Sequence, residues 1–101
     1  MKLPKQLDIF GENYDVLEED LCEEDALGKC NQSTKLIKIC KKGNTNREMT
    51  LHTLIHEMGH GAWEELSLSQ IEALNPYEEI ICNSWATLIM KNFDIRIKRR
   101  K

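Results

Sequence analysis

Residues 51–66, LHTLIHEMGHGAWEEL, hold all three histidines of the chain, at positions 52, 56 and 60. His56, Glu57 and His60 form the pattern H-E-x-x-H. Side chains four residues apart lie one turn apart on the same face of a helix, so both imidazoles can reach one metal ion. Glu57 is rotated by about 100° from His56 around the helix axis, so it borders the same cleft without being a ligand. There it can accept a proton from a water molecule that zinc has activated.

A zinc ion that catalyses hydrolysis needs three protein ligands and an open position for water. Glu79 follows His60 by nineteen residues, at the start of a second predicted helix, and supplies a carboxylate. Glu78 competes for the same role. We favour Glu79 because Asn83 then lies one turn later on the same face, where it can hold the free ring nitrogen of a ligand histidine. The predicted site consists of His56, His60 and Glu79 as Zn²⁺ ligands, Glu57 as general base and Asn83 as support.

His52 shares the face of the other two histidines but is predicted to lie outside the metal site. Two helical turns separate it from His60 by roughly 12 Å, which is too far for both rings to bind one ion. We expect a partly exposed histidine, or one that supports a ligand. Gly59 and Gly61 each cost roughly 1 kcal/mol of helix propensity relative to alanine. Two such residues beside the motif indicate that another backbone packs closely here.

The elements that position these residues follow from the pattern of apolar residues. KQLDIF and YDVLEED predict two short strands, and ALGKC with TKLIKIC predicts a hairpin closed by NQS. KKGNTN then breaks the pattern, and the apolar residues after it have helical spacing. The sequence therefore predicts one α+β domain over residues 1–101, with a small antiparallel sheet followed by two main helices, the first of which carries H-E-x-x-H.

The first helix is predicted from about Arg47 to Glu65, with Asn44 or Thr45 as its cap. Its apolar residues recur every three or four positions, as on the buried face of a helix. Pro76 suits the first turn of the second helix, which should run from about Tyr77 to Asn92. The predicted buried side chains of that helix are Ile80, Ile81, Trp85, Leu88 and Ile89.

Length and composition exclude several classes of protein. At 101 residues the chain has room for one small domain. It has no run of about 18 apolar residues that could cross a membrane, and MKLPKQLDIF lacks the apolar core of a secretory signal, which predicts a cytoplasmic protein. Cys22, Cys30, Cys40 and Cys82 lack the C-x-x-C spacing of a zinc knuckle, so we expect them to be reduced and partly buried. The alternative, a disulfide or second metal site formed by Cys22, Cys30 and Cys40, is not supported by their spacing.

The net charge of −3 neither favours nor excludes a nucleic-acid partner, but its distribution is uneven. Residues 18–25, EEDLCEED, form an acidic run, either a solvated loop or a surface for a basic partner. Residues 96–101, RIKRRK, form a basic tail, either a solvated end or a source of non-specific, salt-dependent affinity for nucleic acid. The sequence leaves these alternatives open, and it leaves the oligomeric state open as well.

Two motifs carry a resemblance to known peptidases. H-E-x-x-H, followed after about twenty residues by E-x-x-x-N on a helix, resembles the gluzincin arrangement of thermolysin. TLIHEMGHGAWEEL with EEIICNSWATLI resembles small phage-encoded metallopeptidase-like proteins, which are similar in pattern to the ImmA/IrrE and SprT-like groups and their motif E-x-x-A-N-x-F-A. Glu79, Asn83 and Ala86 match that motif, whereas Cys82 and Trp85 stand where alanine and phenylalanine would be.

The resemblance implies a minimal zincin-like metallopeptidase of phage or prophage origin, located in the host cytoplasm, that cleaves a peptide or protein substrate. It implies His56, His60 and Glu79 as zinc ligands and Glu57 as general base. The alternative function is a non-catalytic binding or regulatory protein that zinc stabilises by joining two helices.

Larger peptidases of this kind have a second lobe with a histidine or tyrosine that stabilises the oxyanion, and this chain has no room for such a lobe. Tyr14 and Tyr77 are candidates for that role, or else ordinary half-buried aromatic residues. The enzymatic hypothesis therefore requires a site that works without a second lobe.

Overall fold

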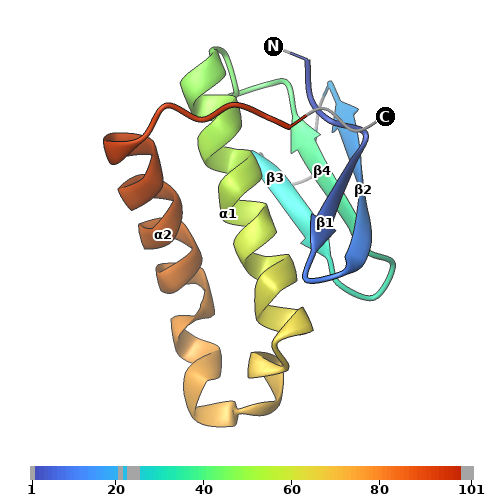
Figure 1. The fold of residues 1–101 in the computed structure, drawn as a ribbon, viewed down its shortest axis with the longest axis vertical. Helices are drawn as coiled ribbons and strands as arrows, with labels where there is room; N and C mark the ends of the chain where they lie inside the picture. Colours follow the sequence, from blue (N-terminus) through green and yellow to red (C-terminus); the bar gives the residue numbers. More distant parts are fainter. Residues whose placement is uncertain (1, 21, 23–25, 99–101) are drawn as a thin grey trace.

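The computed structural model describes residues 2–20, 22 and 26–98. These residues form a four-stranded sheet followed by two helices, so the predicted α+β class is confirmed (Figure 1). The strands are β1 (Gln6–Ile9), β2 (Glu12–Glu19), β3 (Gly28–Asn31) and β4 (Leu36–Cys40). The helices are α1 (Arg47–Glu65) and α2 (Glu78–Asn92), joined by the 3₁₀ helices η2 (Leu68–Gln70) and η3 (Glu72–Tyr77).

The sheet has the strand order β1-β2-β4-β3 and is mixed. β1 pairs with β2 and β3 with β4 in antiparallel fashion, but β2 and β4 are parallel. The predicted antiparallel sheet is therefore wrong at its centre, because the pairing within hairpins does not determine which strand of the second hairpin meets β2. β4 takes the central place because Ile37, Ile39 and Cys40 are fully buried there, whereas β3, with the sequence GKCN, lies at the edge.

The elements form three layers, with the sheet on one side, α1 in the middle and α2 on the outside (Figure 1). The core lies between the sheet and α1 and contains Ile9, Tyr14, Ile37, Ile39 and Leu54. The segment after α2 crosses the start of α1 and returns toward the sheet (Figure 1), where Ile97 packs against this core. On the way, the carbonyl oxygen of Ile95 accepts a hydrogen bond from the guanidinium of Arg47.

α1 has the predicted bounds, but its cap is Asn46. The Asn46 side chain accepts a hydrogen bond of 2.9 Å from the backbone N–H of Met49, as expected of an N-cap residue. The predicted caps, Asn44 and Thr45, are therefore wrong. Asn44 instead donates hydrogen bonds to the carbonyl oxygens of Leu27 and Cys40 and accepts one from the hydroxyl of Thr53. It thereby joins the ends of the β3–β4 hairpin to α1.

α2 begins at Glu78, after η3, which contains Pro76. Its buried residues are Cys82 and Ala86, so small side chains face α1. The prediction that the large apolar residues of this helix are buried is wrong for four of them, which are 48–63% exposed: Ile80, Ile81, Trp85 and Leu88. Ile89 is half-buried.

Two of the four cysteines differ from the prediction of reduced thiols. Cys22 and Cys40 form a disulfide, whereas Cys30, which is half-buried, and Cys82, which is buried, are free. Parts of the acidic run (residues 21 and 23–25) and of the basic tail (residues 99–101) lie outside the described residues. Within the described residues, no helix is both long and apolar enough to cross a membrane.

Tyr14 is fully buried and ties the sheet to the end of α1. Its hydroxyl donates a hydrogen bond of 2.6 Å to Oε2 of Glu65, and Nζ of Lys35 donates one of 2.8 Å to the same oxygen. The Lys35 ammonium also lies 5.3 Å from the centre of the Tyr14 ring, within the range of a cation–π contact. Burial, and then the hydrogen bond to Glu65, raise the pKa of Tyr14, so the hydroxyl stays protonated and remains a donor.

Tyr14→Phe should lower the free energy of unfolding by about 1–2 kcal/mol, because a buried hydrogen bond to a charged acceptor is lost while the ring stays in place. The loss appears as a lower urea midpoint at constant slope. Tyr77→Phe is the matched control, since Tyr77 is 54% exposed, and it should change the stability by less than about 0.5 kcal/mol. Equal midpoints for Tyr14→Phe and the unmodified protein would contradict this role.

Candidate metal centre

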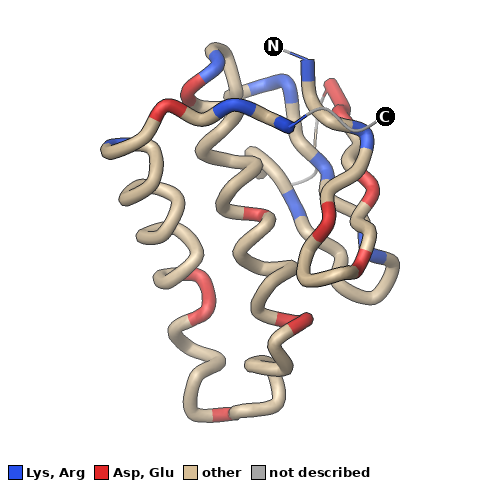
Figure 2. The backbone as a smooth tube through the Cα atoms, viewed as in Figure 1, with Lys and Arg blue, Asp and Glu red and all other residues tan. Residues whose placement is uncertain are grey.

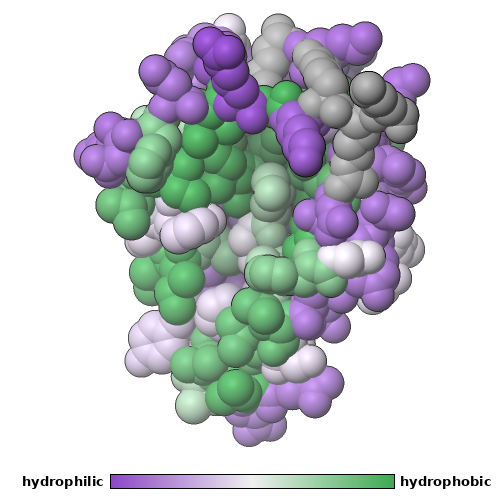
Figure 3. Space-filling model, in the orientation of Figure 1, coloured by the Kyte–Doolittle hydropathy of each residue, from purple (hydrophilic) through white to green (hydrophobic). Residues whose placement is uncertain are grey.

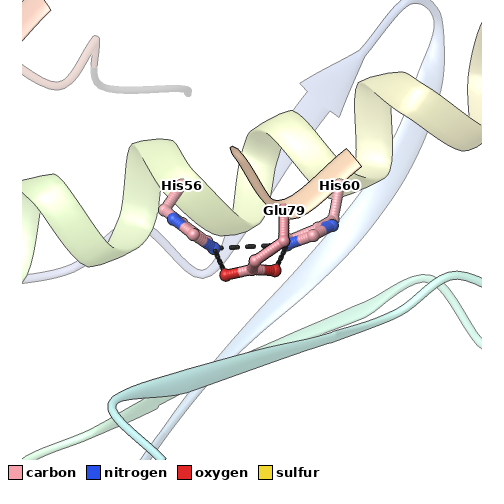
Figure 4. Close-up of side chains that lie close together, drawn as sticks. All are labelled: His56, His60 and Glu79. Atoms are coloured by element: carbon pink, nitrogen blue, oxygen red, sulfur yellow. Dashed lines mark hydrogen bonds and ion pairs between the residues drawn. The ribbon is translucent and has the colours of Figure 1, made fainter. Parts of the chain in front are cut away.

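His56 and His60 lie one turn apart on α1 and point at the carboxylate of Glu79, which comes from the first turn of α2 (Figure 4). Nε2 of His56 lies 2.8 Å from Oε1 of Glu79, and Nε2 of His60 lies 2.9 Å from Oε2. The two Nε2 atoms are 3.2 Å apart. The structure therefore brings together the three residues predicted as metal ligands.

The spacing of these donor atoms suits a metal ion. Ligand distances of about 2.0–2.1 Å in a tetrahedral zinc site imply edges of about 3.3 Å between donor atoms. The observed separations of 2.8 to 3.2 Å are slightly shorter, so shifts of a few tenths of an ångström would admit an ion. The side chains of His56 and His60 are 13% and 16% exposed, whereas that of Glu79 is 72% exposed. The group is thus buried on the α1 side and open on the Glu79 side.

The contacts of Glu78 and Glu79 show which of the two faces both histidines, a choice that the sequence alone left open. Oε2 of Glu78 lies 2.6 Å from Nδ1 of His60, on the ring nitrogen that points away from Glu79. A carboxylate at that nitrogen fixes the ring orientation and tautomer of a ligand histidine. This is the support predicted for Asn83, which is exposed and has no hydrogen bond to either histidine among the described contacts.

Two glycines allow the neighbouring elements to approach α1 at the motif. A Cβ atom on Gly59 would lie 3.0 Å from Sγ and 3.2 Å from Cβ of Cys82 on α2. A Cβ atom on Gly61 would lie 2.7 Å from Cδ1 of Ile9 and 3.3 Å from the ring of Tyr14. Close packing is present at both glycines, but the predicted approach of another backbone is found only at Gly59, where Cα of Cys82 would lie 3.5 Å from the added atom, whereas side chains are nearest at Gly61. At Gly59 the neighbour is the helix that carries Glu79.

Glu57 is 7% exposed and lies on the sheet side of the two histidines. A Cβ atom on Gly28 of β3 would lie 3.3 Å from Cγ of Glu57, so the edge strand runs directly beside this carboxylate. Burial raises the pKa of Glu57 to about 7, with Glu79 adding to the rise and His60 opposing it. A buried carboxyl with a pKa near neutral can both accept and return a proton at physiological pH.

A cavity of about 260 Å³ connects these groups. His56, Glu57, His60 and the two glutamates line it from the helices, and Gly28, Lys29, Cys30 and Gln32 line it from the β3 side. The Gln32 side chain donates a hydrogen bond of 2.6 Å to the carbonyl oxygen of His60. Burial, and then Glu57, raise the pKa of Cys30 to about 12, which disfavours a thiolate ligand. No sequence pattern predicted the contribution of β3, because its residues lie about thirty positions before the motif.

The remaining candidates lie outside the group of donor atoms. Nε2 of His52 lies 3.0 Å from Oγ1 of Thr87 on α2, and burial, followed by the charge of His56, lowers the pKa of His52. His52 therefore joins the two helices and is not one of the clustered ligands, as predicted. The Tyr14 hydroxyl is bonded to Glu65, and Tyr77 is exposed immediately before α2. Neither tyrosine lines the cavity.

A scan of the sequence against protein-family models found no matching family, and searches of curated proteins and of solved structures found no match. The function of this chain must therefore be inferred from the geometry of its own residues.

Glu79→Gln should raise the dissociation constant for Zn²⁺ more than Glu78→Gln does, because the first change removes a ligand and the second only the support of His60. For Glu78→Gln we expect an increase of about 10- to 100-fold. Affinities are measured by competition with a chromophoric chelator. Glu72→Gln, an exposed residue of η3, serves as the control and should have no effect. A larger loss for Glu78→Gln than for Glu79→Gln would reverse the two roles.

The metal affinity should also depend on pH. The Cys82 side chain and the hydrogen bond to Glu78 raise the pKa of His60 to about 10, while burial opposes this rise. Because a protonated ring cannot bind a metal, binding must displace that proton, and affinity should increase up to about tenfold per pH unit between roughly pH 7 and 9. Glu78→Gln removes one cause of the raised pKa and should flatten this dependence. A flat profile for the unmodified protein would show that His60 is already neutral.

Proposed function

We propose that this chain is a zinc-dependent metallopeptidase with a minimal zincin-like domain. The observation that carries the proposal is the convergence of His56, His60 and Glu79 beside the buried carboxylate of Glu57 in one cavity. Two imidazoles, one carboxylate and an open side form the ligand set typical of a catalytic zinc ion. Imidazole ligands favour zinc over magnesium or calcium, which prefer oxygen ligands alone.

A bound zinc ion would supply Lewis-acid chemistry, lowering the pKa of a water molecule and polarising the carbonyl group of a peptide bond. Glu57 accepts the proton of the attacking water and passes it to the leaving amine, for which a pKa near 7 is well suited. Glu78 holds His60 in the orientation that directs Nε2 toward Glu79. Glu57 is buried and the two histidine side chains are only 13% and 16% exposed, so these groups lie in a medium of lowered dielectric constant, where charges interact more strongly than in water.

A peptide substrate is supported by the position of β3. Among the described residues this strand pairs only with β4, and it therefore forms an edge of the sheet. Its residues Gly28, Lys29 and Cys30 line the cavity that contains Glu57. An extended peptide can pair with the free backbone groups of such an edge, which would place one of its peptide bonds beside the metal ligands.

The alternative, a non-catalytic binding protein, is supported by a different observation. The three candidate ligand residues come from two helices, and Glu79 of α2 contacts both His56 and His60 of α1. Zinc would then stabilise the packing of the two helices without any chemistry. The two functions differ in what they require of Glu57, which is a base in the first and has no role in the second.

Zinc-loaded Glu57→Gln should cleave a peptide library about 10²- to 10⁴-fold more slowly than the unmodified protein, because the proton acceptor is lost while all three ligands remain. Cleavage is followed by mass spectrometry, and zinc content is measured on the same samples to confirm equal loading. Glu48→Gln, an exposed residue on the same helix, is the control and should retain full activity.

The non-catalytic alternative predicts a different set of results. Neither the unmodified protein nor Glu57→Gln would cleave any peptide, while zinc would raise the melting temperature of both. His60→Ala would abolish that stabilisation. Equal cleavage rates for Glu57→Gln and the unmodified protein, at equal zinc content, would exclude Glu57 as the general base.

A further inference from the structure

The outer face of α2, together with Tyr77 at the end of η3, carries large apolar side chains that are about half exposed. Five of them are 48–63% exposed: Tyr77, Ile80, Ile81, Trp85 and Leu88. Figure 3 shows apolar side chains gathered on the side of the molecule that carries α2. We refer to these five residues together with Ser84, which is also exposed, as the α2 stripe.

The α2 stripe has the geometry of a helix–helix interface. Positions 77, 81, 84 and 88 follow one another at intervals of four, three and four residues, which is the spacing of a seam between two packed helices. Ile80 and Trp85 flank this seam on either side. Cys82 and Ala86, which pack against α1, lie on the opposite face of the helix. The stripe is therefore directed away from α1, and only Trp85 at its edge also lines a cavity with residues of β1, α1 and the segment after α2.

The size of the α2 stripe matches that of a small, specific interface. Tyrosine and tryptophan bury about 150–250 Å² each when fully covered, and isoleucine or leucine about 60–120 Å². At the observed exposures, the five side chains offer on the order of 400 Å² of apolar area. Apolar atoms make up about 60% of the area buried in an interface. Two partners of this kind would therefore bury roughly 1,300 Å² of accessible surface in total. That value lies within the range of stable complexes.

We propose that the partner of the α2 stripe is a second copy of this chain, packed through α2 in antiparallel orientation about a twofold axis. Two-fold dimers are the commonest closed assemblies, and they use the same patch on both copies. The distribution of charge selects the orientation. α2 begins with Glu78 and Glu79 and ends with Lys91, and Arg96 and Lys98 follow.

Figure 2 shows this polarity along the helix, with acidic residues near its start and mostly basic ones along the segment beyond its end. The carboxylates of Glu78 and Glu79 turn toward His60 and His56 of α1, so they give this end of α2 its charge without entering the α2 stripe. An antiparallel pair aligns the two helix dipoles favourably and keeps like ends apart, whereas a parallel pair places like ends together. The polarity of the helix therefore favours the antiparallel dimer.

The spacing of the α2 stripe fits this arrangement. With the axis between Ser84 and Trp85, Ile81 of one copy lies opposite Leu88 of the other, and Ser84 provides room for the two backbones to approach. The donor atoms of His56, His60 and Glu79 lie on the opposite side of α2, between the helices and β3. Dimerisation would therefore leave the candidate metal centre accessible in both copies, whatever its function.

The test is sedimentation velocity of the unmodified chain over a range of about 1–100 μM. We expect a monomer–dimer equilibrium with a dissociation constant of micromolar order, as for interfaces at the lower end of the standard size. Leu88→Glu should raise this constant at least about tenfold, because the new carboxylate enters the apolar contact beside the acidic start of the other helix. Leu88 is 59% exposed, so the substitution leaves the fold intact.

Leu17→Glu is the matched control. Leu17 is 46% exposed on β2, where it lies opposite Lys38 in the parallel register, and its substitution should leave the dissociation constant unchanged. A monomer at every concentration, an assembly larger than a dimer, or equal dissociation constants for Leu88→Glu and the unmodified chain would each overturn the proposal. Equal weakening by Leu17→Glu would do the same.

Single cysteine substitutions test the orientation. Under mild oxidation, Ser84→Cys should form a covalent dimer, because this position lies next to the twofold axis. Tyr77→Cys should not, since the two copies of residue 77 would be roughly 20 Å apart at opposite ends of the interface. The unmodified chain, whose free cysteines are buried or half-buried, is the control. A covalent dimer from Tyr77→Cys would indicate parallel helices and would overturn the antiparallel arrangement.

Discussion

The candidate site depends on how closely α2 can approach α1, and one glycine sets that distance. Gly59 lies between the two candidate ligand histidines in sequence, and the space that its missing side chain leaves is filled by Cys82 of α2. Glu79 lies three residues before Cys82, about one turn earlier in the same helix, so the position of Cys82 fixes how far the carboxylate reaches. A methyl group at Gly59 would push the helices apart by a few tenths of an ångström or more, which is the same order as the tolerance of a metal site.

The same close approach explains why the burial of α2 was predicted incorrectly. The period of its apolar residues indicated a helix correctly, but a period does not show which face is inside when both faces carry apolar residues. The helix presents Cys82 and Ala86 to Gly59 and its neighbours, because only small side chains fit at that distance. The larger residues remain outside. A prediction that places the largest side chains of a helix inside is wrong where a glycine on the neighbouring helix brings the two backbones so close that only small side chains fit.

Features that depend on residues close together in the sequence were predictable. The bounds of α1 and the set His56, His60 and Glu79 follow from spacings within one or two helices, and the structure places these residues together. The order of the strands was not predictable in this way, because the pairing of β2 with β4 joins segments about twenty residues apart. For the same reason, the sequence did not indicate that Gly28 brings β3 against Glu57. The choice between Glu78 and Glu79 required coordinates, since the two residues are adjacent and chemically identical.

The connection between α1 and α2 has a consequence for how such a domain could be enlarged. η2 and η3 bury none of their residues, and they lie at the end of the helices farthest from the start of α1 (Figure 1). Added residues at an exposed connection of this kind cost little stability, because the energy of closing a loop grows only slowly with its length. The connection leads directly into Glu78 and Glu79. An inserted segment would therefore emerge beside the cavity, where a second lobe could cover it without any change to the sheet or to the histidine helix.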